Sequence, residues 1–293
     1  MIMIIDLHIH SKTCSDGNLS VEEIIAEAKT RNIELMSITD HDSICCQEQA
    51  KRLASINDIT YINGLELNIN FSHSKFNKGK PISLDLLAYQ FDIKNRELNR
   101  KLEKISDYRE KRAKKILENL NSEFEKEGIE ILTKKDLIAI QNSVDGVLGR
   151  PHIADYLIKK CIVKDRQEAF NKYLVKCNVE KYPLSLEVAS NIIRNAGGIV
   201  VLAHPNDPYG TSLIKLTKSL SEQTTIIKDS MLNFIDGIEC WHFRNDAKTT
   251  DHYFAFSIKY KLIMTGGSDC HQKPVRMGSV KVPNFVAQQF DIH

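Results

Sequence analysis

The sequence predicts an α/β fold in which a parallel sheet or barrel is interrupted by a helical insertion. Apolar runs of strand length alternate with amphipathic helical segments in both end regions of the chain. Between these regions, apolar residues recur at helical spacing among many charges. Polar residues also collect where the predicted strands end, which is how parallel barrels build their functional sites.

The N-terminal region begins with a strand and a helix. The run from Ile2 to Ile5 is apolar enough for a strand buried on both faces. A helix is expected over residues 20–32, because Ser20 is a suitable N-cap and Glu23 completes a capping box. Further strands are expected within residues 33–43, 58–68 and 81–92.

The middle of the chain, residues 94–182, is predicted to be a helical insertion that covers the site. Its first part, near residues 93–128, has the pattern of a long amphipathic helix. Shorter helices are expected within residues 133–141, 151–160 and 165–176. The remaining residues, 1–93 and 183–293, would form the domain that carries the site.

The C-terminal region returns to the alternation of helix and strand. A helix with glycine at its end is expected over residues 185–198. Buried strands follow, and each again ends in polar residues. These strand ends carry His204, then Glu239 with His242, and finally Asp269 with His271.

Composition and charge exclude several classes of protein. With 293 residues and 42% hydrophobic content, the chain can bury a sizeable core. A formal net charge of +2 gives no strong field for indiscriminate binding to nucleic acid or membranes. The seven cysteines include no CxxC pair, and we find no signal segment or long apolar run. We therefore expect reduced thiols in a cytoplasmic protein without a membrane span.

The polar strand ends suggest a metal centre. Because successive strand side chains point to opposite faces, His8 and His10 share a face. Many imidazoles and carboxylates in one place repel one another unless positive charge lies among them. Nitrogen and oxygen donors without thiolate favour zinc, manganese or iron, and their number favours two or three ions. The candidate ligands are His8, His10, Asp16, His41, Glu66, His152, His204, Asp269 and His271.

Six motifs occur in the order typical of one enzyme family. They are DLHIHSKTCSDG, ITDHDS, GLE, GRPHIA, VLAHP and GGSDCH. In these motifs the chain resembles the PHP (polymerase and histidinol phosphatase) family of metal-dependent phosphoesterases nearly end to end. It is most similar to the branch with a helical insertion, which includes nucleotide and 3',5'-bisphosphate phosphatases and 5'-3' exoribonucleases.

The resemblance implies a distorted (β/α)7 barrel with a trinuclear metal centre. The first ion would bind His8, His10, Glu66 and Asp269. The second would share Glu66 and add His152 and His204. The third would bind Asp16, His41 and His271. Where many relatives have a histidine in an HILGY strand, this chain has DLLAY with Asp85.

The expected reaction is hydrolysis of a phosphate ester by metal-bound hydroxide. Arg150 is the first candidate for a bidentate phosphate contact, and Arg276 is the second. Asp40 would be an outer carboxylate or proton carrier, and Asp6 would orient a histidine of the first strand. Both aspartates could equally hydrogen-bond the backbone at strand ends.

Two residues near the end of the strand at 234–242 complete the predicted site. His242 would contact the substrate or its leaving group, and Trp241 would stack a base. The leading substrate is nucleotide-like, either a 3',5'-nucleotide bisphosphate or a 5'-phosphorylated short RNA. The sequence suggests no stable protein partner.

Other functions stay open at this point. A cyclic-phosphate phosphodiesterase and a monophosphatase similar to histidinol phosphatase would use the same metals. A non-catalytic metal-binding accessory module is the rival from another class, and an amidohydrolase also carries an early HxH motif. The complete ligand set argues against the accessory module, and Glu66 with the RPH and SDCH motifs fits an amidohydrolase less well.

Overall fold

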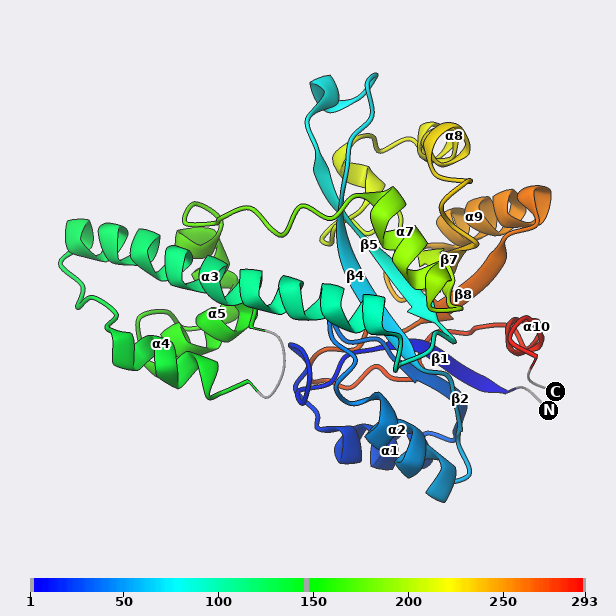
Figure 1. The fold of residues 1–293 in the computed structure, drawn as a ribbon, viewed down its shortest axis with the longest axis horizontal. Coiled ribbons are helices and arrows are strands. Elements are labelled where there is room, and N and C mark those ends of the chain that lie inside the picture. The colour runs from blue at the N-terminus through cyan, green and yellow to red at the C-terminus, as the bar shows by residue number, and fades with distance from the viewer. Residues whose placement is uncertain (1–2, 145–147, 292–293) are drawn as a thin grey trace.

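The computed structural model describes residues 3–144 and 148–291 as an α/β fold with an added helical lobe (Figure 1). In the N-terminal region, β1 and β2 are each followed by a helix, and β4 and β5 form a hairpin. The bounds are β1 Ile4–Ile9, α1 Val21–Thr30, β2 Ile33–Ile38, α2 Gln47–Ile56, β3 Thr60–Tyr61, β4 Gly64–Phe71 and β5 Ile82–Tyr89. The predicted helix at 20–32 is confirmed, including the capping box of Ser20 and Glu23.

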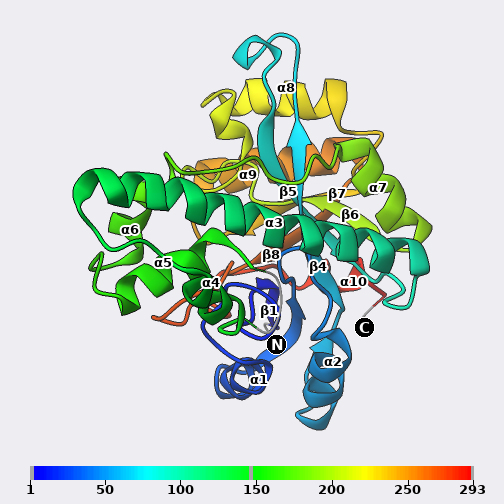
Figure 2. The ribbon, with the colours of Figure 1, turned by 60° about the vertical axis from the view of Figure 1, so that its left-hand side comes forward.

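The C-terminal region adds three strands and the helices that cover them. The bounds are α7 Leu186–Asn195, β6 Ile199–Leu202, α8 Leu220–Ser230, β7 Gly237–His242, α9 Ala247–Tyr260, β8 Ile263–Gly267 and α10 Phe285–Gln288. Helix α7 packs on β4 and β6, and α9 packs on β7 and β8 (Figure 2). The carboxyl ends of these strands carry the predicted site residues.

The strands form two sheets that meet at two places. One sheet has the order β1-β2-β3 and the other β4-β5-β6-β7-β8. Isolated parallel bridges join them, one between His41 and Glu66 and one between Ile9 and Cys270. Each bridge includes a residue that follows a strand, His41 after β2 and Cys270 after β8, so the bridges bring polar residues of the two sheets together.

The pairing of β5 differs from the parallel alternation that the sequence predicts. Strand β5 runs antiparallel to both β4 and β6. A loop at residues 72–81 joins β4 to β5 as a hairpin, and a hairpin makes its two strands antiparallel. The other neighbouring pairs within the two sheets are parallel among the described strands.

The helical lobe is built on one long helix. Helix α3 spans Arg96–Glu127, as the sequence predicts for this segment, and Gly128 ends it with a φ of 69°. Its first half packs on the sheet through Leu98, Leu102 and Ile105. Its second half packs in a separate core with α4 Lys134–Gln141, α5 Arg150–Lys159, α6 Arg166–Ala169 and a π-helical turn at Phe170–Leu174.

The prediction of reduced cysteines is wrong for one pair. Cys14 and Cys45 form a disulfide, with their Cα atoms 6.0 Å apart. They lie in the loops after β1 and β2, and these parallel neighbours bring their following loops side by side. Their separation of 31 residues carries no local signal, so the sequence could not show the pairing. No helix in the described part of the chain is long and apolar enough to cross a membrane.

The separate core predicts that the insertion is held by its own apolar contacts. Leu120 on α3 is completely buried in that core. Leu120→Ala should lower the free energy of unfolding by about 2–5 kcal/mol, because it removes buried methyl groups and leaves a cavity. Urea unfolding measures this change. Glu118→Ala on the same helix is the control, since Glu118 forms only a surface ion pair with Lys115 and should change stability by at most about 1 kcal/mol. Equal effects of the two substitutions would contradict the packing.

Candidate metal centre

The first ligand group gathers at the end of β1. His8 and His10 lie on one face of the strand, with their Nε2 atoms 3.1 Å apart. Asp269 Oδ1, after β8, lies 3.4 Å from both atoms. Glu66 Oε2, from β4, lies 3.2 Å from His10 Nε2 and 3.6 Å from His8 Nε2. The four residues predicted for one ion therefore come together from three strands.

Glu239 on β7 fixes the orientation of this group, and it is not among the site residues predicted from the sequence. Its Oε1 lies 2.9 Å from His8 Nδ1, and its Oε2 accepts a hydrogen bond from the His204 backbone N at 2.7 Å. A carboxylate on one imidazole nitrogen leaves the other free for a metal. The signal was present, because Glu239 is one of the polar residues that end predicted strands.

Asp6 does not orient a histidine ring as predicted. Its carboxylate accepts backbone hydrogen bonds from Ser268 at 2.9 Å and from Gly278 at 2.8 Å, and one from His8 at 3.3 Å. Asp6 is completely buried, so these backbone donors replace its lost hydration. It therefore joins β1 to the segment that carries Asp269.

The second group differs from the expected one. His204 Nε2 lies 3.0 Å from Glu66 Oε1 and 4.0 Å from Asp85 Oδ2. Asp85 lies on β5, at the position where the sequence departs from the HILGY pattern. These three residues form a buried group whose donor atoms could share one ion. Asp85 thus replaces the expected His152 beside Glu66 and His204.

His152 lies apart from Glu66 and His204, the two residues with which the resemblance groups it. Its Nδ1 accepts a hydrogen bond from the Gly149 backbone N at 2.9 Å. Its Nε2 lies 3.1 Å from the carbonyl oxygen of Ser15, next to Asp16. His152 lies in the first turn of α5, where this backbone cap fixes its ring. Both ring nitrogens are occupied by these contacts.

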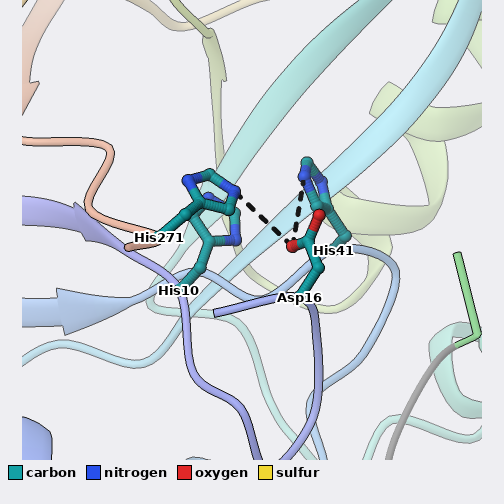
Figure 3. A group of neighbouring side chains, drawn as sticks. All are labelled: His10, Asp16, His41 and His271. Atoms are coloured by element: carbon teal, nitrogen blue, oxygen red, sulfur yellow. Dashed lines mark ion pairs between the residues drawn. The ribbon is translucent and has the colours of Figure 1, made fainter. Parts of the chain in front are cut away.

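The third group combines residues from the loops after β1, β2 and β8. Figure 3 shows His271 and His41 directed toward the carboxylate of Asp16, with His10 beside them. Asp16 Oδ1 lies 3.5 Å from His271 Nε2 and 3.9 Å from His41 Nε2. The rings of His10 and His271 stack with their centroids 3.9 Å apart. These residues match the third predicted set, with His10 in addition.

The chemistry of these groups fits divalent cations. Glu66 Oε2 is buried and makes no hydrogen bond of proper geometry to any described residue, although His41 Nδ1 lies 2.9 Å away. Burial alone lowers the pKa of His10, but contacts with Asp269 and Glu66 raise it to about 10. Burial also opposes protonation of His204, but Glu66 raises its pKa to about 9. The carboxylates thus require positive charge nearby, which protons or metal ions can supply.

Three residues near the site have left-handed backbone conformations. The φ angles are 23° for His204, 48° for Asp269 and 52° for Asp42. Non-glycine residues adopt this region at a cost, and such residues are common at functional sites. Asp42 is held by an ion pair with Arg109 from α3 and by a hydrogen bond from the Asn68 backbone N at 3.1 Å.

Asp40 and His242 are both buried beside the ligands. Asp40 accepts hydrogen bonds from Ser11 N and Ser11 Oγ at 2.6 Å, and from Cys46 Sγ at 3.1 Å. It therefore holds the loop after β1 and does not line the cavity described below. The side chain of His242 is completely buried, and its Nε2 lies 3.3 Å from Asp269 Oδ2. His242 therefore contacts Asp269, one of the candidate metal ligands, and does not reach the cavity surface.

A cavity of about 800 Å³ opens over the ligand groups. Its floor includes Glu66, Asp85 and Asp269, and its walls are rich in basic side chains. The basic lining residues are Arg150, Lys181, Lys215, Arg244, Lys273 and Arg276. Anionic substrates suit such a cavity, because positive walls raise their local concentration.

The predicted substrate contacts divide into two kinds. Arg150 and Arg276 both line the cavity. Trp241 does not, because it extends from β7 toward the outer helices and packs against Phe254 and Phe285, with ring centroids 5.8 Å from each. The predicted role of Trp241 in base stacking is therefore corrected. A register irregularity in β7 between Glu239 and Trp241 lets Trp241 face away from the ligands although Glu239, two residues earlier, contacts His8.

Buried imidazoles and carboxylates at strand ends, beneath a basic cavity, define a metal-dependent hydrolase that acts on phosphate esters. The PHP domain matches residues 6–182, which is more than half of the chain. The chain belongs to the PHP family of metal-dependent phosphoesterases, and the resemblance seen in the sequence is confirmed.

Individual relatives have nucleotide or RNA substrates in their names. The chain is 31% identical to a 5'-3' exoribonuclease of Haemophilus influenzae over 68% of each chain. It is 27% identical to a 3',5'-nucleoside bisphosphate phosphatase of Chromobacterium violaceum, over 91% of this chain and 87% of that one. A crystal structure from Bifidobacterium adolescentis shares the fold, with a TM-score of 0.80 and 24% identity over 99% of this chain and 96% of that one.

The second group yields a prediction about metal content. Asp85→Ala should remove about one bound divalent ion per chain, because Asp85 lies with Glu66 and His204. His152→Ala should keep the metal content of the unsubstituted protein, because its ring contacts only backbone groups among the described residues. Elemental analysis of the purified proteins measures both. Loss of an ion only in the His152 variant would restore the grouping predicted from sequence.

Metal binding should also depend on pH. In the metal-free protein, His10 and His204 have pKa values raised to about 10 and about 9, so both carry protons at pH 7. A histidine must lose its extra proton to bind a metal, so binding should release protons and the apparent affinity should rise between pH 6 and pH 9. Titration calorimetry with Mn²⁺ in buffers of different ionisation enthalpy measures the released protons. An observed enthalpy that is the same in every buffer would contradict the raised pKa values.

Proposed function

We propose that this phosphoesterase hydrolyses nucleotide-like substrates, either a 3',5'-nucleoside bisphosphate or a 5'-phosphorylated short RNA. The proposal is supported by the named activities of the two relatives and by the basic cavity. One substrate phosphate would lie over the ligand groups. A second phosphate would lie against the basic wall formed by the insertion.

Lys181 carries this proposal. It lines the cavity, and no hydrogen bond or ion pair joins its amine to another residue in the described ranges 3–144 and 148–291. Burial lowers the pKa of Lys181, whereas the nearby Asp85 raises it. An amine in such a position lacks the partner that a buried cation normally has. A substrate phosphate would provide one.

Arg150 would share the same phosphate. Its guanidinium lies over the Phe170 ring, 5.3 Å from the centroid, and makes one long hydrogen bond of 3.4 Å to the Leu174 carbonyl oxygen. Most of its donors are therefore available for a bidentate contact. Arg150 and Lys181 also line a smaller hollow beside Asp16 and His41, so their charges lie next to the third ligand group.

Two or three manganese, zinc or iron ions would occupy the ligand groups. When bound, they would neutralise phosphate oxygens and lower the pKa of a coordinated water. His8, His10, Glu66 and Asp269 would hold one ion, Glu66 with Asp85 and His204 a second, and Asp16 with His41 and His271 a third. His242 would position Asp269, and Asp40 would position the loop after β1.

The same proposal includes the domain organisation. Residues 1–93 and 183–293 would form one distorted barrel, closed through the bridges at Ile9 and His41. Residues 94–182 would cover the active site as an insertion. The ion pair between Arg109 of α3 and Asp42 would hold the insertion over the loop that follows His41.

Phosphate release from a substrate panel tests the function. The panel contains 3',5'-nucleoside bisphosphates, 5'-phosphorylated oligoribonucleotides, a cyclic phosphate diester, histidinol phosphate and an amide. Lys181→Ala should lower kcat/KM on the bisphosphate by about tenfold or more, since it removes one charged contact to a phosphate. Lys51→Ala on α2 is the matched control, because Lys51 is exposed and does not line the cavity.

The panel also separates the alternatives. His10→Ala should abolish phosphate release, because His10 belongs to two ligand groups. Preference for the cyclic ester or for histidinol phosphate would replace the nucleotide proposal within the same chemistry. Release from none of the phosphate esters by a metal-loaded protein would favour the accessory module, and activity on the amide alone would favour an amidohydrolase.

A further inference from the structure

The outer wall of the cavity contains a stack of alternating aromatic and guanidinium groups. The Cζ atom of Arg244 lies 5.4 Å from the ring centroid of Tyr209 and 4.6 Å from that of Phe243. The Cζ atom of Arg276 lies 5.0 Å from the Phe243 centroid. All four side chains line the cavity that opens over the ligand groups. The order across the wall is therefore Tyr209, Arg244, Phe243 and Arg276.

This stack is assembled from separate segments of the chain. Tyr209 lies in the loop after β6, Phe243 and Arg244 directly follow β7, and Arg276 lies in the segment after β8. These are the same strand ends that carry His204, His242 and Asp269. The stack is thus placed by the strands that place the ligands.

Arg244 is fixed in this arrangement. Its Nη1 donates a hydrogen bond of 2.5 Å to Asp207 Oδ2. Asp207 is almost completely buried, and its Oδ1 also accepts a hydrogen bond from the Tyr209 backbone N at 2.9 Å. One carboxylate therefore positions both Arg244 and Tyr209, so the outer part of the stack is preorganised.

The two ends of the stack are open to a ligand. Tyr209 is 83% exposed, the largest exposed fraction among the large hydrophobic residues on the described surface. Arg276 is exposed, and its guanidinium has no hydrogen bond or ion pair to the residues that the structure describes. An exposed ring and an unpaired guanidinium beside a basic cavity suit a flat group attached to an anion.

We propose that Tyr209, Arg244, Phe243 and Arg276 form a subsite for a nucleobase. This inference rests on the proposed function, because the base would belong to the nucleotide whose phosphate lies over the ligand groups. Every base has a π face, so aromatic and guanidinium planes bind bases with little dependence on sequence. A sugar phosphate or an amino-alcohol phosphate has no such face. The subsite would therefore recognise that a base is present, and it would not distinguish one base from another.

The test compares two substrates that carry the same phosphates, one with a base and one without it. The two substrates are adenosine 3',5'-bisphosphate and its abasic analogue, and the measured quantity is the ratio of their kcat/KM values. Tyr209 and Arg276 lie at opposite ends of the stack, so one base contacts only one of them, and the exposed ring of Tyr209 is the expected contact. Tyr209→Ala should lower this ratio by about tenfold, which is the typical effect of losing one stacking partner, and Arg276→Ala tests the other end of the stack. Tyr209→Phe keeps the ring face and should keep the ratio of the unsubstituted enzyme.

A control variant separates the subsite from general effects of losing a surface aromatic. Tyr260 on α9 lies near Lys259, with the amine 5.5 Å from its ring centroid, and it does not line the cavity. Tyr260→Ala should leave the ratio unchanged. If Tyr209→Ala and Arg276→Ala also leave the ratio unchanged, the stack does not recognise the base and the inference is overturned.

A binding measurement keeps the inference independent of turnover. Calorimetry on the metal-free protein compares adenosine 5'-monophosphate with ribose 5-phosphate. We expect tighter binding of the nucleotide, with the difference lost in Tyr209→Ala. Nucleotide binding of this kind without hydrolysis of any nucleotide would refute the proposed function alone. Hydrolysis of nucleotides with equal affinity for the two ligands would refute the subsite alone.

Discussion

The structure depends on a buried concentration of negative charge at the ends of its strands. Glu66 is completely buried, and its two oxygens lie within 3.2 Å of nitrogens from His10, His41 and His204. Those three histidines come from different loops and strands, so one carboxylate contacts residues that follow strands of both sheets. A carboxylate in this position must be matched by positive charge, and the donor set around it is suited to divalent cations. The arrangement of strands, bridges and insertion follows from keeping these groups together.

Several residues of the candidate site could be predicted from the sequence, because one rule relates the ends of strands to the position of a site. Polar residues at the ends of buried strands converge in an α/β fold, so His8, His10, His204 and Asp269 could be grouped before any distance was known. Glu66 joins them from near the start of β4. The long helix and the capped helix at 20–32 were similarly predictable, because periodicity and capping are properties of neighbouring residues.

Other features depend on contacts between distant segments, and such contacts cannot be predicted from the pattern of neighbouring residues in one sequence. The antiparallel direction of β5 follows from a hairpin whose loop resembles any polar connection. His152 lies in a family motif, but a backbone amide and a carbonyl oxygen occupy its ring. The direction of Trp241 depends on a register irregularity beside it in β7. Lys181 has ordinary neighbours in sequence, and only the fold shows that it lines the cavity.

The left-handed backbone at Asp42, His204 and Asp269 has a consequence for how this protein can evolve. Each such conformation costs on the order of 1–3 kcal/mol in a non-glycine residue. Glycine would relieve that cost at His204 or Asp269, but it would remove a side chain that the chemistry needs. At these two positions that gain in stability is therefore closed to selection while the activity is required. A descendant that lost its activity would be free to accumulate glycine there, which would mark the loss in its sequence.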